Sequence, residues 1–105
     1  MTEDVFVALA DPTRRAVLDL LATRGEGTAT SLAAELPISR VAVIKHLAVL
    51  DRAGLVQSRR AGREVRFAVR PERLHATASW LNRLAAEWDT RLARIKRMAE
   101  AAPPR

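Results

Sequence analysis

Cysteine is absent from the 105 residues of this chain. That absence excludes disulfide bonds, thiolate metal ligands and a cysteine nucleophile together. Tyrosine is also absent, only two histidines are present, and no glycine-rich phosphate loop can be found among four glycines. No pair of nucleophile and base is therefore available, and we predict that the chain is not an enzyme and has no catalytic residue.

Long apolar runs are missing as well. The run Val5–Ala10 is too short for the core of a signal peptide or for a membrane span. A chain without cysteine is compatible with a reducing compartment. We therefore expect a cytoplasmic protein with no membrane partner, built as one domain over residues 1–105.

Positive charge is concentrated in the middle of the chain. The formal net charge is +6, and residues 39–66 hold seven Lys and Arg against two acidic residues, a balance of +5. Residues 1–38 sum to −3 and residues 67–105 to +4. This distribution favours contact with a phosphate backbone, although charge that serves only solubility is the alternative.

Turn signals divide the first part of the chain into helices. Asp11 is a good helix cap and the proline after it suits a first turn, so we predict helices over residues 3–10 and 13–24. Gly25 and Gly27 should end the second of these helices.

A helix-turn-helix pattern follows. Thr30 or Ser31 should open a small helix, and a turn through Pro37 leads to Ser39, which should cap a longer helix that Gly54 ends. At 100° per residue, one side of the longer helix is apolar and should face the core. The core side holds Val43, Leu47 and Leu50, and the opposite side holds Val41, Lys45, Ala48 and Arg52.

A basic hairpin comes next. Residues 55–61 and 63–69 read as two strands with Gly62 at the tip. Alternation of Val65, Phe67 and Val69 with Arg66 predicts one buried and one wet face. The exposed ribbon should carry Arg59, Arg60, Arg63 and Arg66. Helix, turn, helix (residues 30–52) and hairpin (residues 55–69) together predict a mainly α fold with a small β-hairpin, the winged helix-turn-helix.

The last predicted helix runs over residues 71–102, before a short tail, 103–105, that we expect to be disordered. Its apolar residues recur at alternating spacings of four and three: Leu74, Ala78, Leu81, Ala85, Trp88, Leu92, Ile95 and Ala99. A small domain cannot cover so long an apolar face alone. We therefore predict a homodimer formed by the terminal helices, residues 1–10 and 71–102; packing within one chain is the alternative.

Four segments together resemble the ArsR/SmtB family of bacterial transcriptional regulators, in a branch that lacks the metal-binding cysteines. They are Ala8–Arg15, Ile38–Leu50, Ala53–Val56 and Arg60–Phe67. The resemblance covers nearly the whole chain. It implies a homodimeric DNA-binding repressor or activator whose recognition helix is the one that holds residues 39–50.

The chain departs from the family's pattern in two ways. Pro37 stands where many helix-turn-helix turns have glycine, and it cannot take a positive φ, so the turn must be reshaped. Val41 and Ile44 stand where polar residues are common, and they could either meet thymine methyl groups or pack on neighbouring helices.

The predicted DNA-binding residues come from the recognition helix and the wing. Lys45 and Arg40 could reach phosphates or guanine edges rather than simply solvate the helix, and Arg63 at the wing tip suits a minor groove. His46 suits a structural hydrogen bond better than a base contact. The full set is Ser39, Arg40, Val41, Ile44, Lys45, His46, Arg59, Arg63 and Arg66.

The predicted dimer interface uses the apolar residues of both terminal helices. They are Phe6, Leu9, Leu74, Ala78, Leu81, Ala85, Trp88, Leu92 and Ile95. Glu72 and His75 lie one turn apart, but a single histidine makes a poor transition-metal site, so we predict no metal and no cofactor.

The resulting hypothesis is a sequence-specific regulator, a homodimeric repressor on a pseudo-palindromic operator with double-stranded DNA as its partner. One alternative is a protein–protein docking module that uses Val41 and Ile44. Another is a regulator that binds an apolar small molecule near Trp80, Leu84 and Trp88.

Overall fold

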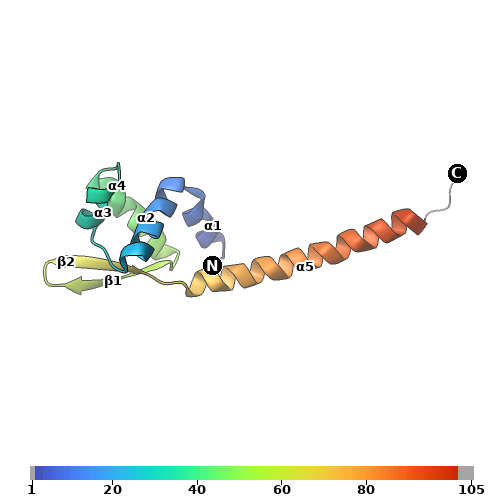
Figure 1. Ribbon diagram of the computed structural model, residues 1–105. Coiled ribbons are helices and arrows are strands. Elements are labelled where there is room, and N and C mark those ends of the chain that lie inside the picture. The colour runs from blue at the N-terminus through green and yellow to red at the C-terminus, as the bar shows by residue number, and fades with distance from the viewer. Residues whose placement is uncertain (1, 102–105) are drawn as a thin grey trace. The chain divides into compact units, whose positions relative to one another are not determined.

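A computed structural model describes residues 2–101 (Figure 1). Its elements in chain order are α1 (Thr2–Ala10), α2 (Pro12–Arg24), α3 (Ala29–Glu35), α4 (Arg40–Arg52), β1 (Val56–Ala61), β2 (Glu64–Val69) and α5 (Glu72–Ala101). Contacts group the chain into two compact units, a body that ends at Leu74 and a helical segment that begins at His75. The predicted tail 103–105 lies outside the described residues.

The junction between α1 and α2 forms as the sequence predicts. Asp11 Oδ1 accepts hydrogen bonds from the backbone N–H of Thr13 (2.8 Å) and of Arg14 (3.3 Å). The hydrogen bond from the Arg14 backbone is the main cause that lowers the pKa of the Asp11 carboxyl below its usual 3.8. Gly25 ends α2 with φ of +84°, a conformation that favours glycine.

The start of α3 differs from the prediction. Thr28 caps this helix, not Thr30 or Ser31, which lie inside it. Thr28 Oγ1 accepts from the backbone N–H of Ser31 (3.0 Å), and Ser31 Oγ accepts from that of Thr28 (2.9 Å). This reciprocal capping box satisfies two backbone donors and so moves the start of α3 to Ala29.

The core of the body lies among the first four helices and the start of β1. α2 contacts α1, α3, α4 and β2, and is therefore central to the packing. The largest side chains that are fully buried are Leu21, Leu32, Leu47, Leu50, Leu55, Val5, Val17, Val43 and Val56. Burial of such aliphatic side chains is the main force that holds the helices against the hairpin.

The hairpin pairs β1 and β2 antiparallel, with Ala61 opposite Glu64 and a two-residue loop between them. Gly62 has φ of +66° and no other residue type has a positive φ among residues 2–101, the pattern of a type II′ turn. β1 begins at Val56 and β2 at Glu64, one residue later than predicted in each case.

Two other details of the sheet correct the prediction. Gly27 does not help to end α2; its N–H and C=O pair with the C=O and N–H of Phe67 at 3.0 and 2.8 Å, as a third short strand would. The expected burial alternation in β2 is also wrong, because Val65 is 39% exposed and Arg66 is half-buried. Near its tip the hairpin extends past the core, so neither face is covered there.

α5 begins at Glu72, one residue after Pro71, and its thirty residues correspond to a length of about 45 Å. Its apolar side is largely exposed: Trp88 is 56% exposed, Leu92 63% and Ile95 61%. Over residues 2–101, none of the helices combines the length and the apolar character that a bilayer crossing demands.

Candidate nucleic-acid interface

The turn before α4 contains no left-handed residue. Leu36 is extended, with φ of −121° and ψ of 147°, as the residue before a proline should be. Ser39 is also extended, and its Oγ accepts a hydrogen bond from the backbone N–H of Ala42 (3.1 Å). Pro37 is accommodated in this way, and the cap fixes where α4 begins.

A glycine fixes where α4 ends. Gly54 has φ of +74°, and its N–H donates to the C=O of Asp51 (2.9 Å). The N–H of Leu55 donates to the C=O of Leu50 (2.9 Å), and both leucine side chains are buried. These two hydrogen bonds and the apolar contact form a Schellman motif, which confirms the predicted left-handed cap.

α4 has one buried side and one exposed side, as its sequence predicts. Val43, Leu47 and Leu50 are at most 1% exposed. On the other side Val41 is 61% and Ile44 43% exposed, so neither is absorbed by neighbouring helices. The remaining exposed residues of α4 are Arg40, Lys45, Ala48, Asp51 and Arg52.

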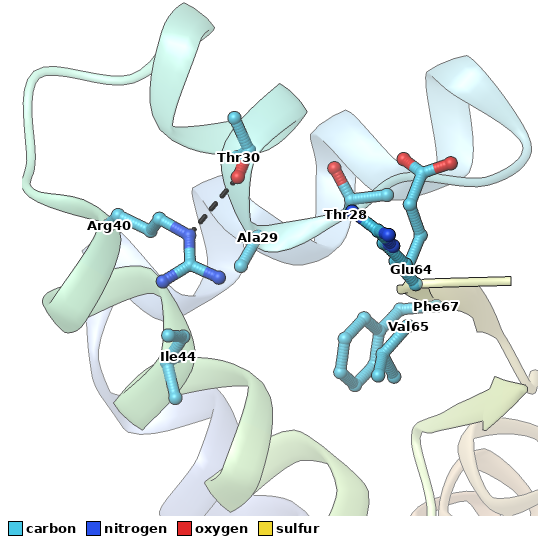
Figure 2. A pocket seen from close by; sticks show the side chains of 9 residues that line it. Thr28, Ala29, Thr30, Arg40, Ile44, Glu64, Val65 and Phe67 are labelled. Carbon is cyan, nitrogen blue, oxygen red and sulfur yellow. Dashed lines mark hydrogen bonds between the residues drawn. The ribbon is translucent and has the colours of Figure 1, made fainter. Parts of the chain in front are cut away.

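A groove of about 470 Å³ separates the start of α4 from the wing (Figure 2). Arg40 extends from α4 toward α3, where its Nε donates to Thr30 Oγ1 (3.0 Å). Ile44 lies one turn further along α4. The opposite wall comes from the hairpin, and the whole lining is Thr28, Ala29, Thr30, Arg40, Ile44, Arg63, Glu64, Val65 and Phe67. The groove thus joins predicted DNA-binding residues of α4 and of the wing.

Strand register sorts the wing arginines onto two faces. Arg60 lies opposite Val65, and residues that are directly opposite share a face. Val65 lines the groove, so Arg60 belongs to the face that looks toward α4. Arg59 lies opposite Arg66 on the other face. Arg60 was not among the predicted DNA-binding residues, although the register implied by a two-residue loop could have found it.

The arginines on the far face are paired with acids. Arg59 donates to Glu26 through Nε (3.1 Å) and through a terminal nitrogen (3.0 Å). Arg66 lies 3.6 Å from Glu26 and 3.3 Å from Glu64. A contact of Arg59 or Arg66 with phosphate therefore stays a prediction and must compete with these pairs. Arg63 lines the groove, on the side of the wing that faces α4.

His46 is half-buried and contacts Arg14 of α2. The Arg14 guanidinium lies 3.3 Å from Nδ1 of His46, and it also donates to the backbone C=O of Ala8 (2.7 Å) and of Val7 (3.2 Å) at the end of α1. This hydrogen bond agrees with the structural role that we favoured for His46. The role of Arg14 was not predicted, because no local pattern reveals a contact across 32 residues.

The predicted dimer residues divide into two groups. Leu9 and Leu74 are partly buried against the core of the body, whereas Phe6 is 40% exposed. Every predicted position from Ala78 onward is exposed, namely Ala78, Leu81, Ala85, Trp88, Leu92 and Ile95. Within residues 2–101, no group of three His, Asp or Glu side chains gathers where it could hold a metal ion.

Comparison with known proteins gives the same architecture. The profile of a family described as a helix-turn-helix domain matches residues 9–59. A solved structure, an ArsR-like transcriptional regulator from Rhodococcus sp. RHA1, is 46% identical, covers 96% of this chain and 94% of its own, and superimposes with a TM-score of 0.87. The chain belongs to the ArsR/SmtB family.

Curated relatives agree with this ArsR-family assignment. The transcriptional repressor SdpR of Bacillus subtilis (strain 168) is 33% identical over 78 residues, which is 74% of this chain and 86% of the repressor. The HTH-type transcriptional regulator YuzN of the same organism is 46% identical over 65 residues, 56% of this chain and 71% of that protein. As a member of the ArsR family, this chain is a DNA-binding transcriptional regulator.

Proposed function

We propose that this regulator is a homodimeric, cytoplasmic repressor that binds a pseudo-palindromic operator. Each protomer places α4 in a major groove and its wing beside the adjacent minor groove. The two half-sites lie about one helical turn, roughly 34 Å, apart.

The observation that carries the proposal is the exposed side of α4 and the groove beside it. Lys45 lies opposite the buried side of the helix, and no hydrogen bond or ion pair is recorded for it within residues 2–101. It contacts phosphate or a guanine edge in the proposed complex. Arg40, at the start of the helix, contacts the phosphate backbone of the DNA. Val41 and Ile44 contact thymine methyl groups.

Wing residues extend the proposed contact. Arg63 at the hairpin tip enters the minor groove, where a narrow A·T-rich segment attracts arginine. Arg60, on the face toward α4, contacts phosphate. Ser39 acts first as the cap that orients α4, and its hydroxyl is a secondary phosphate donor.

The dimer is supported by the apolar side of α5. Exposed aromatic and aliphatic side chains at regular helical spacing are unfavourable in water and suit a second copy of the same helix. In the proposed dimer Trp88, Leu92 and Ile95 lie at the seam, and Phe6 of α1 adds to it. In the alternative, Val41 and Ile44 dock a protein partner, and that binding would not require DNA.

The test begins with selection of duplexes from a random pool by the wild-type protein. A selected site with two inverted half-sites, bound by one dimer, supports the proposal. The affinity for that site is then measured over a range of salt, and log Kd should rise steeply with log salt because phosphate contacts displace counterions. A slope near zero, or selection of no common sequence, would refute operator binding and favour the docking alternative.

A further inference from the structure

Glu26, in the loop that joins α2 to α3, pairs with both arginines of the far wing face. We propose that Glu26 sets the strength of wing–DNA contact by holding Arg59 and Arg66, so that neither is free to neutralise phosphate. The inference rests on the proposed function, in which the wing lies along DNA, and it adds a residue that balances specific against non-specific binding.

The geometry shows why both arginines need a partner. Arg59 and Arg66 are directly opposite each other on paired strands, where like charges repel. The Glu26 carboxylate accepts two hydrogen bonds from Arg59, a bidentate arrangement, and lies 3.6 Å from a terminal nitrogen of Arg66. Glu26 thereby relieves the repulsion between the two cations, and Glu64 adds a second pair with Arg66 at 3.3 Å.

The position of Glu26 is fixed by the backbone beside it. Gly27, the next residue, exchanges both backbone hydrogen bonds with Phe67. Phe67 is itself the neighbour of Arg66 in β2. Glu26 therefore stays alongside the far face of the hairpin and does not depend on a flexible loop to find its partners.

The remaining wing arginines differ from this pair. No ion pair or hydrogen bond is recorded for Arg60 or Arg63 in the part of the chain that the structure describes, and both are exposed. Of the four wing arginines, two are therefore available to contact DNA and two are held in ion pairs. Loss of the Glu26 charge would release Arg59, whereas Arg66 keeps a second acidic partner, Glu64, at 3.3 Å.

The first experiment replaces Glu26→Gln, which keeps the size of the side chain and removes its charge. We expect the affinity for a random-sequence duplex to rise about tenfold at low salt, because the released Arg59 adds a phosphate contact. The slope of log affinity against log salt should steepen by about one, at roughly 0.9 for the contact that Arg59 adds, because Arg66 keeps its pair with Glu64. The preference for the selected operator over random duplex should fall.

A matched control is available in Glu35→Gln. Glu35 is also paired with an arginine, Arg24. That pair joins α2 to the end of α3. The control removes the same charge and releases one arginine, and among the described residues neither Arg24 nor Glu35 pairs with a side chain of α4 or of the wing. Its affinity should stay within about twofold of the wild type, whereas equal gains for both variants would reduce the effect to net charge and overturn the proposal.

A second replacement, Arg59→Ala, tests the mechanism, and its result in the wild-type background does not depend on how Glu26→Gln folds. In the wild-type background a held arginine contributes little, so we expect a loss of less than about twofold, against several-fold for Arg63→Ala. In the Glu26→Gln background the same replacement should remove a large part of the gain.

Several outcomes contradict the proposal. Glu26→Gln with unchanged or weaker binding and an unchanged salt slope would leave Glu26 a purely structural residue. Arg59→Ala that costs as much as Arg63→Ala in the wild type would mean that Arg59 is already on DNA. If the wild-type protein itself bound no duplex, the proposed function would fail first, and that result is distinguishable from all of these.

Discussion

α4 and α5 are both amphipathic, but they satisfy their apolar sides differently. The apolar side of α4 is buried within its own body, where Val43, Leu47 and Leu50 are almost inaccessible to water. Trp88 and Leu92 on α5 remain more than half exposed. The first helix is therefore complete in one chain, whereas the second has an apolar surface that one chain does not cover.

The two helices obtain their stability from different sources. An isolated helix gains little from propensity alone, and most helical stability in proteins comes from the packing of one face. For α4 this packing is intramolecular, and its opposite side is free for recognition. For α5 we expect it to be intermolecular, so that association and helix stability should be linked.

A substitution that disrupts the packing of α4 should have the greatest effect. Leu47→Ala should lower the free energy of unfolding by about 3 kcal/mol, because it deletes buried methyl groups and leaves a cavity. The loss, measured by urea unfolding, should not depend on protein concentration. Leu92→Ala on α5 is the counterpart, and its effect should shrink as the protein is diluted. If Leu92→Ala lowered the free energy of unfolding equally at every protein concentration, the division between the two helices would be contradicted.

The next effect addresses α5 directly. Trp88→Asp should weaken dimerisation by at least about 2 kcal/mol, or roughly thirtyfold, because it replaces a large aromatic side chain at the proposed seam by a charge. Sedimentation equilibrium would then report a monomer at concentrations where the wild type is a dimer. Thr90→Asp adds the same charge on the solvent side of α5 and should leave the dimer intact. A Trp88→Asp protein that still sediments as a dimer would refute the seam.

A smaller effect concerns the free side of α4. Lys45→Ala should reduce operator affinity about tenfold and the salt slope by about one, because one phosphate contact or guanine contact is lost. The thermal midpoint should stay the same, since the side chain is exposed and lies away from the core. Unchanged operator affinity would show that this side of α4 does not contact the DNA major groove, whether or not the protein is a dimer.

The smallest effect concerns a helix cap in the body. The pKa of Asp11 is lowered in the folded protein, chiefly by the hydrogen bond from the Arg14 backbone, so the stability that its carboxylate contributes is present above pH 3.8. This stability should be lost as the pH falls through the lower, folded pKa. Melting temperatures measured from about pH 5 down to about pH 2 should therefore decline more steeply for the wild type than for Asp11→Asn. Parallel declines would show that the cap does not titrate with folding.

The helices and the hairpin could be placed from sequence to within one or two residues, because their signals are local. Ser39, Gly54 and Gly62 each act through their own backbone or through residues a few positions away. The start of α3 was misplaced because three of the four residues 28–31 have a hydroxyl side chain that could cap a helix. Only the reciprocal bond between Thr28 and Ser31 decides among them.

The electrostatic arrangement of the site could not be predicted in the same way. Glu26 and Arg59 are 33 residues apart, and no local sequence pattern around either residue predicts that they pair. The separation of Arg60 from Arg59 was within reach, since a two-residue loop at Gly62 fixes the register of the hairpin. Charge density along the sequence points to the proposed interface, but the pairing of each charge depends on the assembled fold.

One guanidinium has a mechanical consequence for recognition. Arg14 is a donor only, so Nδ1 of His46 must accept, and the imidazole then has its proton on Nε2. Through this ring α4 is tied to the carbonyl end of α1. A rotation of α4 about its own axis would break that link, and a displacement of α1 would pull on the proposed recognition helix.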